Sequence, residues 1–186
     1  MPMKSTLFAS AALVLAACSP ANVAQYEIQM PAVAPARPAR IMIEVAEVSL
    51  PLYAQSQEIA VADAAGAIRT DPDKLWADDM QRAVSLALAE SLMRHSGAVV
   101  AAEPWPLLDR AEARLDVRVK TLVAGVDGQL RFAGQYFLVF DDARRPRINW
   151  FDLSVPLPRI SAAAVSRATG LAIDGLAQEI ASKIRR

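Results

Sequence analysis

Apolar and polar residues alternate in several short stretches of the chain, which is the pattern of half-buried β-strands. Six segments have this alternation or a short apolar run: 41–46, 58–61, 98–102, 114–121, 130–141 and 148–155. In the clearest of them, Leu115, Val117 and Val119 alternate with charged side chains. An Asp-Gly pair at 127–128 and a polar stretch at 141–146 supply turns, so the last three segments are expected to form an antiparallel meander.

Two longer stretches have the 3.6-residue period of amphipathic helices. The first is expected to begin at Asp71-Pro72-Asp73, because an aspartate cap followed by proline is typical of a helix start, and to end near His95. Trp76 would then lie in the first turn of this helix. The second helix is expected to run from Ser161, which can cap it, to about Ile184.

The predicted order is two strands, a helix, four strands and a second helix. An amphipathic helix must bury its apolar stripe, and a sheet with one apolar face provides the surface for it. The sequence therefore predicts an α+β fold, a mainly antiparallel β-sheet with two amphipathic helices packed on one face. Residues 41–186 have the length of one domain. Within it, Gly134 is expected to mark a bulge or a close approach of another backbone.

The beginning of the chain has a different pattern. Lys4 precedes an apolar run over 7–17, which has the length of a secretory signal and is too short to span a bilayer core of ~30 Å comfortably. The run ends in Leu15-Ala16-Ala17-Cys18, which has the form of a lipobox. We expect residues 1–17 to be a lipoprotein signal peptide and Cys18, the only cysteine, to carry lipid. The alternative is an ordinary secretory signal with a chance cysteine.

Residues 18–40 contain prolines among alanines and lack apolar periodicity. We expect a tether here, which would span about 26 Å as a flexible coil and about 68 Å when extended. Each buried methylene of an acyl chain contributes ~0.8 kcal/mol to membrane binding, and a single chain binds only marginally. Stable anchoring therefore needs two or three acyl chains. Ser19 follows Cys18 where an aspartate would favour the inner membrane, so an outer-membrane anchor facing the periplasm is expected.

Composition narrows the classes of function. Twenty basic and twenty acidic residues cancel, so no global field attracts nucleic acid or an anionic membrane. The apolar fraction of 54% reflects the signal and many alanines, and no other run approaches the length of a membrane-spanning helix. With Cys18 acylated, no thiol remains for cysteine catalysis or for a thiolate metal site.

His95 is the only histidine, and no potential metal ligands stand at suitable spacing beside it. We expect it to be a capping or surface residue at the end of a helix. Pairs of aspartates fall at expected helix starts and turns, where aspartate is common. No nucleophile elbow, phosphate loop or zinc-protease motif is present. The sequence therefore predicts a protein that is not an enzyme and that holds no cofactor and no metal.

Two features are candidates for contact with a partner. Trp105 lies between two prolines on a stiff loop, and tryptophan is enriched in interface hot spots. It can equally fold back as a lid on the core. Arg144, Arg145 and Arg147 cluster in one turn, which would suit an acidic partner or a lipid phosphate. The simpler interpretation of this turn is a solvated hairpin tip.

Three motifs together carry a resemblance to a known family. Leu50-Pro51-Leu52-Tyr53, the strand at 57–61 and Leu75-Trp76-Ala77-Asp78 resemble the ABC-type transport auxiliary lipoproteins, or PqiC-like lipoproteins. The resemblance extends over the whole predicted domain in element order and includes the lipobox. The chain departs from the family at Ala62-Asp63, where an arginine is common, and at Asp78-Asp79, where an acidic residue and a proline are usual.

The resemblance implies a role beside mammalian-cell-entry (MCE) proteins. Their hollow assemblies carry phospholipid across the periplasm, driven by an inner-membrane ATPase and permease. The lipoprotein would be an accessory docking subunit, held at the outer membrane by its acyl chains, forming a homo-oligomeric ring and supporting envelope integrity. It would bind no nucleotide itself. The alternative is a stand-alone periplasmic lipoprotein that holds a lipid in an apolar cavity.

Overall fold

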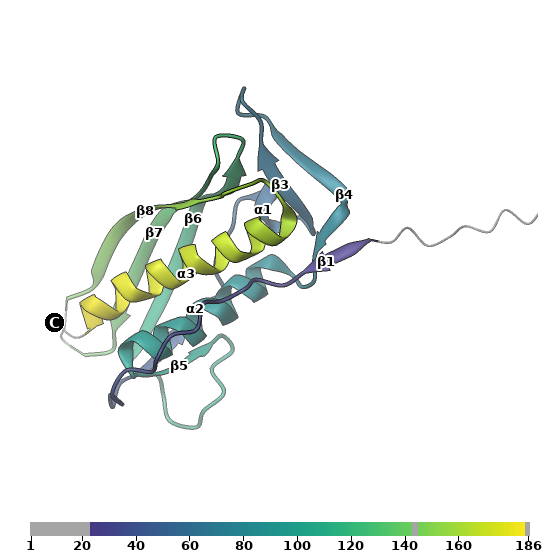
Figure 1. Cartoon of the computed structure of the whole chain (residues 1–186). Coiled ribbons are helices and arrows are strands. Elements are labelled where there is room, and N and C mark those ends of the chain that lie inside the picture. Colours follow the sequence, from purple (N-terminus) through teal and green to yellow (C-terminus); the bar gives the residue numbers. More distant parts are fainter. Residues whose placement is uncertain (1–22, 143–144, 185–186) are drawn as a thin grey trace, which may run out of the picture.

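The structure, a computed structural model, describes residues 23–142 and 145–184. In chain order its elements are β1 (Ala24–Tyr26), β2 (Met42–Val45), α1 (Leu52–Gln55), β3 (Glu58–Ala62), β4 (Ile68–Trp76), α2 (Met80–Ser96), β5 (Val99–Ala102), β6 (Ala113–Gly125), β7 (Gln129–Phe140), β8 (Arg147–Pro156) and α3 (Ala162–Ile184). All strands belong to one mixed sheet, and α2 and α3 cover one of its faces (Figure 1). The predicted α+β fold, with two helices on one face of a mostly antiparallel sheet, is confirmed.

The meander of β6, β7 and β8 is the largest part of the sheet, and it forms as predicted. β6 pairs with β7 from Ala113↔Phe140 to Gly125↔Gln129, and β7 pairs with β8 over most of its length. The register of β6 shifts between Val119 and Thr121. A Cβ placed on Gly134 would lie 2.3 Å from the carbonyl oxygen of Arg118 in this region. The expected close approach at Gly134 is therefore confirmed.

The other edge of β6 is shared by two strands, which periodicity does not predict. β2 pairs with the beginning of β6 and β3 with its end, both in parallel. β5 lies outside β2, while β4 and then β1 lie outside β3. Parallel pairing joins elements that are distant in the chain, so local patterns carry no signal for it.

The core lies between the sheet and the two helices. Its largest fully buried side chains come from both layers and include Tyr136, Phe132, Ile43, Met80, Leu88, Leu115, Ile173 and Leu176. The helices run parallel and touch through Ser91 of α2, whose hydroxyl donates to Asp174 Oδ1 of α3 at 2.6 Å. No helix in residues 23–142 and 145–184 is long and apolar enough to cross a membrane.

The first helix begins later than predicted. Residues 68–76 form β4, and α2 starts at Met80 with Asp79 as its cap, whose carboxylate accepts from Arg82 N at 2.9 Å. The prediction of a helix from Asp71 is wrong because this segment pairs with strands on both sides. Pro72 lies where the pairing with β3 is irregular, so its missing N–H interrupts no ladder hydrogen bond. Trp76 ends β4 and is buried in the core.

The segment expected to be a tether is part of the fold from Ala24 onward. β1 pairs in parallel with β4, and residues 27–39, called the strap below, run along α2 and α3 to their far ends (Figure 1). Ser166 of α3 donates to the carbonyl of Glu27. At the other end of the strap, Ala36 N donates to Arg94 O at 2.7 Å, and Ala39 N to Gly97 O at 2.8 Å. Hydrogen bonds with the helices replace the flexible span that composition suggested for these residues.

Two glycines let the backbone of the strap lie directly on the helices. A Cβ on Gly170 of α3 would be 2.0 Å from Gln29 O, and one on Gly97 at the end of α2 would be 1.9 Å from Arg37 O. Gly97 also has a positive φ of 73°, as a helix C-cap requires. A side chain at either position would therefore push the strap away from the helix.

Gly170→Ala is expected to destabilise the fold by about 1–3 kcal/mol, because its methyl group forces the strap and α3 apart. The matched control is Gly175→Ala in the same helix, where a Cβ would make an ordinary 3.6 Å contact with Leu153. The control should be neutral or stabilising, since alanine is favoured over glycine in a helix by about 1 kcal/mol. Urea unfolding measures both variants, and faster tryptic cleavage after Arg40 in Gly170→Ala alone would locate the change. Equal stability of the two variants would contradict this packing.

Tyr136 predicts how stability depends on alkaline pH. It is buried, and its hydroxyl donates to Glu179 Oε1 at 3.0 Å. Burial first, and then the charge and hydrogen bond of Glu179, raise the pKa of Tyr136 far above its usual value. Above about pH 10 the unfolded chain releases this proton while the folded chain keeps it, so stability falls as pH rises. Tyr136→Phe should flatten this loss in urea unfolding between about pH 9 and about pH 11. An unchanged slope would refute the assignment.

Candidate docking surface

The predicted contact residues that the structure describes lie at one end of the domain, called the far end below. Trp105 is in the loop between β5 and β6, called the tryptophan loop below. Arg145 lies in the turn before β8 and Arg147 is the first residue of β8, and together they are called the arginine turn. The two loops meet through an ion pair between Arg110 and Asp141, with a nitrogen–oxygen distance of 3.3 Å. The structure thus brings the tryptophan loop and the arginine turn together. Cys18 and Arg144, the other predicted site residues, lie outside the described residues.

Trp105 is held by its own loop. Its indole Nε1 donates to the carbonyl of Asp109 at 2.6 Å, and the ring is half-buried. It lines a recess of about 170 Å³ together with Arg110, Arg114 and Asp141. The two open interpretations of Trp105 were an interface anchor and a lid on the core. Its ring faces this recess at the far end, next to charged side chains, which fits the first interpretation better.

Ion pairs hold the base of the loop that carries Trp105, and the same loop exposes an apolar side chain. Arg114 Nη1 lies 2.5 Å from Glu44 Oε2, and its Nη2 lies 2.8 Å from Glu103 Oε2, which ties the base of the loop to β2 and β6. Burial lowers the pKa of Arg114, but the hydrogen bonds of Glu44 and Glu103 raise it above its usual value. Leu108 is fully exposed at the loop. Leu107 beside it is 47% exposed, so two neighbouring leucines lie at the surface of this loop, next to Trp105.

A second exposed surface lies on the face of the sheet opposite the helices. Phe137 and Val139 of β7 and Ile148 and Trp150 of β8 form it, and we call it the outer-face patch. Trp150 is 71% exposed and Ile148 58% exposed, and Ile148 is directly opposite Phe137 in the register. Sequence reasoning missed this patch. The signal was present, because adjacent strand residues point to opposite faces and Phe151 occupies the core.

Charged side chains of β6 border the outer-face patch. The guanidinium of Arg118 lies over the ring of Phe137, 4.8 Å from its centroid, and Asp116 binds the same guanidinium at 2.9 Å. The hydrogen bond with Asp116 raises the pKa of Arg118. On the other side of the patch, β8 pairs only with β7 and leaves an edge open among the described residues. An apolar centre with a charged rim beside a free strand edge is the anatomy of a protein interface.

His95 contributes to the helix packing. It lies in the last turn of α2 as predicted, but its ring faces α3 and its Nε2 is 2.9 Å from Asp174 Oδ1. The same oxygen accepts from Ser91, so the carboxylate stands between the hydroxyl and the imidazole. The prediction of a plain capping or surface residue is therefore incomplete. The cluster links α2 to α3, and no group of three metal-binding side chains occurs in the described part of the chain.

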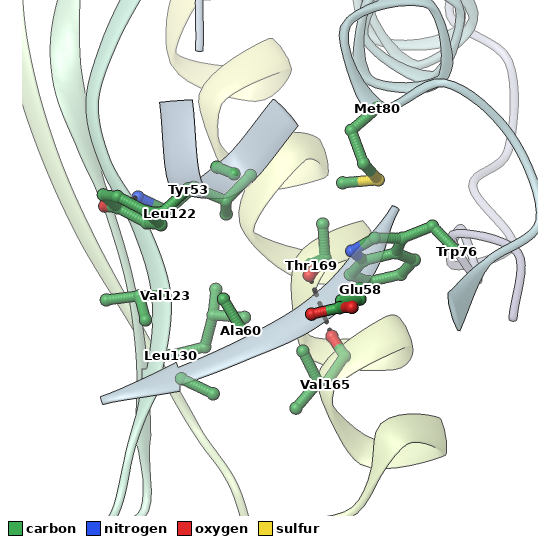
Figure 2. Close-up of a pocket in the computed structure, with 12 residues that line it drawn as sticks. Tyr53, Glu58, Ala60, Trp76, Met80, Leu122, Val123, Leu130, Val165 and Thr169 are labelled. Carbon is green, nitrogen blue, oxygen red and sulfur yellow. Dashed lines mark hydrogen bonds between the residues drawn. The ribbon is translucent and has the colours of Figure 1, made fainter. Parts of the chain in front are cut away.

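One pocket and one groove are relevant to the alternative that the domain itself binds a lipid. Figure 2 shows an internal pocket between α1, β3 and α3, lined by Tyr53, Glu58, Trp76, Met80 and Thr169, with a volume of about 20 Å³. This volume is close to that needed by one water molecule. An open groove of about 340 Å³ lies between α2 on one side and the end of β1 with the first residues of the strap on the other. The groove reaches the lower range of small-ligand sites.

Comparison with known proteins identifies the family. The family model described as ABC-type transport auxiliary lipoprotein component matches residues 26–181, so the chain belongs to this family. The resemblance carried by the motifs at 50–53 and 75–78 is thereby confirmed. The match begins inside β1, in agreement with a folded unit that includes the strap. No curated protein matches the sequence.

Solved structures share the fold at low sequence identity. A crystal structure of an uncharacterized protein has a TM-score of 0.68 at 16% identity, covering 83% of this chain and 99% of its own. A Xanthomonas campestris protein of the DUF330 family has a TM-score of 0.67 at 17% identity, covering 87% of this chain and 94% of its own. A PelC dodecamer from Paraburkholderia phytofirmans is more distant, with a TM-score of 0.47, 14% identity and 79% and 92% coverage. These likenesses concern the fold.

Neighbouring residues of β8 test which face of the sheet is open. Phe151→Ala should cost about 3–5 kcal/mol, because its ring packs in the core 4.9 Å from the ring of Phe132. Trp150→Ala, the matched control one residue away, should change stability by less than about 0.5 kcal/mol, since its ring is exposed. Urea unfolding of the two variants gives the answer. A large loss in Trp150→Ala would mean that the outer-face patch is not open.

Proposed function

We propose that this protein is a lipoprotein of the outer membrane, facing the periplasm, and a docking subunit of an MCE-type ABC transport system. That system would move phospholipid between membranes and support envelope integrity. The observation that carries the proposal is membership of the transport auxiliary lipoprotein family over residues 26–181. The lipobox at Leu15-Ala16-Ala17-Cys18 supports the anchoring. A docking subunit supplies binding surfaces, while the ATPase supplies the energy.

The two exposed surfaces have the chemistry that this role needs. The outer-face patch and the open edge of β8 suit a second copy of the chain, because strand edges pair readily and aromatic side chains are enriched in interface centres. Ring formation would use this surface between neighbouring subunits. The tryptophan loop and the arginine turn at the far end suit a different protein, since tryptophan and arginine are enriched in interface hot spots. An MCE-domain protein is the partner that we propose for the far end.

A lipid-binding role is the second candidate, and the groove beside α2 is the observation that favours it. Leu86, Ile28 and Met30 line the groove together with the ring of Trp76, while Glu90 and Arg82 supply charged groups. This arrangement would suit an acyl chain with a polar headgroup. Phospholipid that stays bound to the purified soluble domain, detected by mass spectrometry, would favour this candidate over the docking role.

Crosslinking in intact cells tests the docking role. The tagged, lipidated protein is expected to recover copies of itself together with an MCE-domain protein. Trp150→Ala should reduce the recovery of other copies, and Leu108→Asp should reduce the recovery of the MCE-domain protein, each at least several-fold. Asp152→Ala, on the exposed face of β8 beside Trp150, is the matched control and should change neither. Recovery of outer-membrane proteins without an MCE-domain protein would contradict the proposal and direct attention to the lipid-binding candidate.

A further inference from the structure

The place where the chain enters the domain is well defined. β1 begins at Ala24 and pairs with Lys74–Trp76, and Ala77 N donates to Tyr26 O at 2.9 Å. This junction lies at the end of the domain where α2 and α3 begin, which we call the β1 end (Figure 1). The far end, with the tryptophan loop and the arginine turn, lies where the same helices finish. The chain therefore enters at the end opposite to the proposed partner surface.

The distance between the lipid and the domain is short because the strap is packed. Six Cα–Cα steps separate Cys18 from Ala24, and they span at most about 22 Å. α3 has 23 residues, so the two ends of the domain are separated by about 35 Å along its axis. An inverted domain, standing on its far end, would place Ala24 about 35 Å above the bilayer, beyond the reach of these six steps.

The surface at the β1 end is compatible with lipid headgroups. Ile160 is 43% exposed just before α3. Arg159 precedes it in the chain, and arginine suits phosphate while the apolar side chain suits the acyl boundary. The short connection to the lipid holds these side chains near the bilayer.

We propose that the lipidated protein stands on the bilayer surface with its β1 end, and that the strap enforces this orientation. The far end then points away from the membrane and presents Trp105, Leu108 and the arginine turn to a protein partner. This inference rests on the lipid at Cys18 in the proposed function. It adds the direction in which the domain stands and the structural cause of that direction. A free tether over residues 18–40 would allow any orientation.

Depth-dependent quenching tests the orientation in the full lipidated protein. The thiol of Cys18 is used by the lipid, so a cysteine introduced by Ile160→Cys or Leu108→Cys is the only thiol that a fluorophore can label. The labelled proteins are reconstituted in phosphatidylethanolamine–phosphatidylglycerol vesicles that contain a headgroup quencher. Quenching at residue 160 should exceed that at residue 108 at least several-fold. Equal quenching, or stronger quenching at residue 108, would overturn the inference.

A longer connection tests the cause of the orientation. Insertion of twenty glycine and serine residues between Asn22 and Val23 should raise quenching at residue 108 and reduce the contrast between the two labels. A contrast that survives the insertion would show that the short connection does not orient the domain. Failure of the proposed function itself has a different signature. In that case wild-type protein lacks the acyl mass, its Cys18 thiol reacts with the fluorophore, and the protein leaves the membrane fraction.

Discussion

The structure depends on burying the inner face of the β6–β7–β8 meander under two parallel helices. Each element is amphipathic, and none of them can hide its apolar side alone. Leu115 and Tyr136 from the sheet and Ile173 and Leu176 from α3 are fully buried where the layers meet. Gly134 permits the tight approach of β7 to β6 at the irregular register, so the sheet stays continuous beneath α3.

The strap packs on this helix layer, so these residues belong to the folded domain and do not form a flexible tether. Because Gly97 and Gly170 have no side chains, the backbone of residues 27–39 lies on the helix surface with its own hydrogen bonds to them. The packed strap covers part of the helix pair. Only a short connection is left between Cys18 and Ala24. The same contact therefore serves stability and, in our proposal, the orientation of the domain on a membrane.

The exposed surfaces are what remains after the core is filled. Phe151 takes the inner side of β8, so its neighbour Trp150 must lie outside, beside Ile148. At the far end, the loop of Trp105 is stabilised by its own hydrogen bond and by the contacts of Arg114, and Leu108 is left in solvent. Sites for partners thus arise on strands and loops that the helix layer holds in place.

The sequence by itself determined what is local. Alternation predicted β6, β7 and β8, Ser161 predicted the start of α3, and motifs around Pro51 and Trp76 identified the family. Tertiary structure decided what depends on distant partners. Asp71-Pro72-Asp73 has the local chemistry of a helix start, yet it lies in a strand because β1 and β3 pair with β4. The strap lacks periodicity and packs only because the helices present glycines to it, a contact that no local pattern encodes.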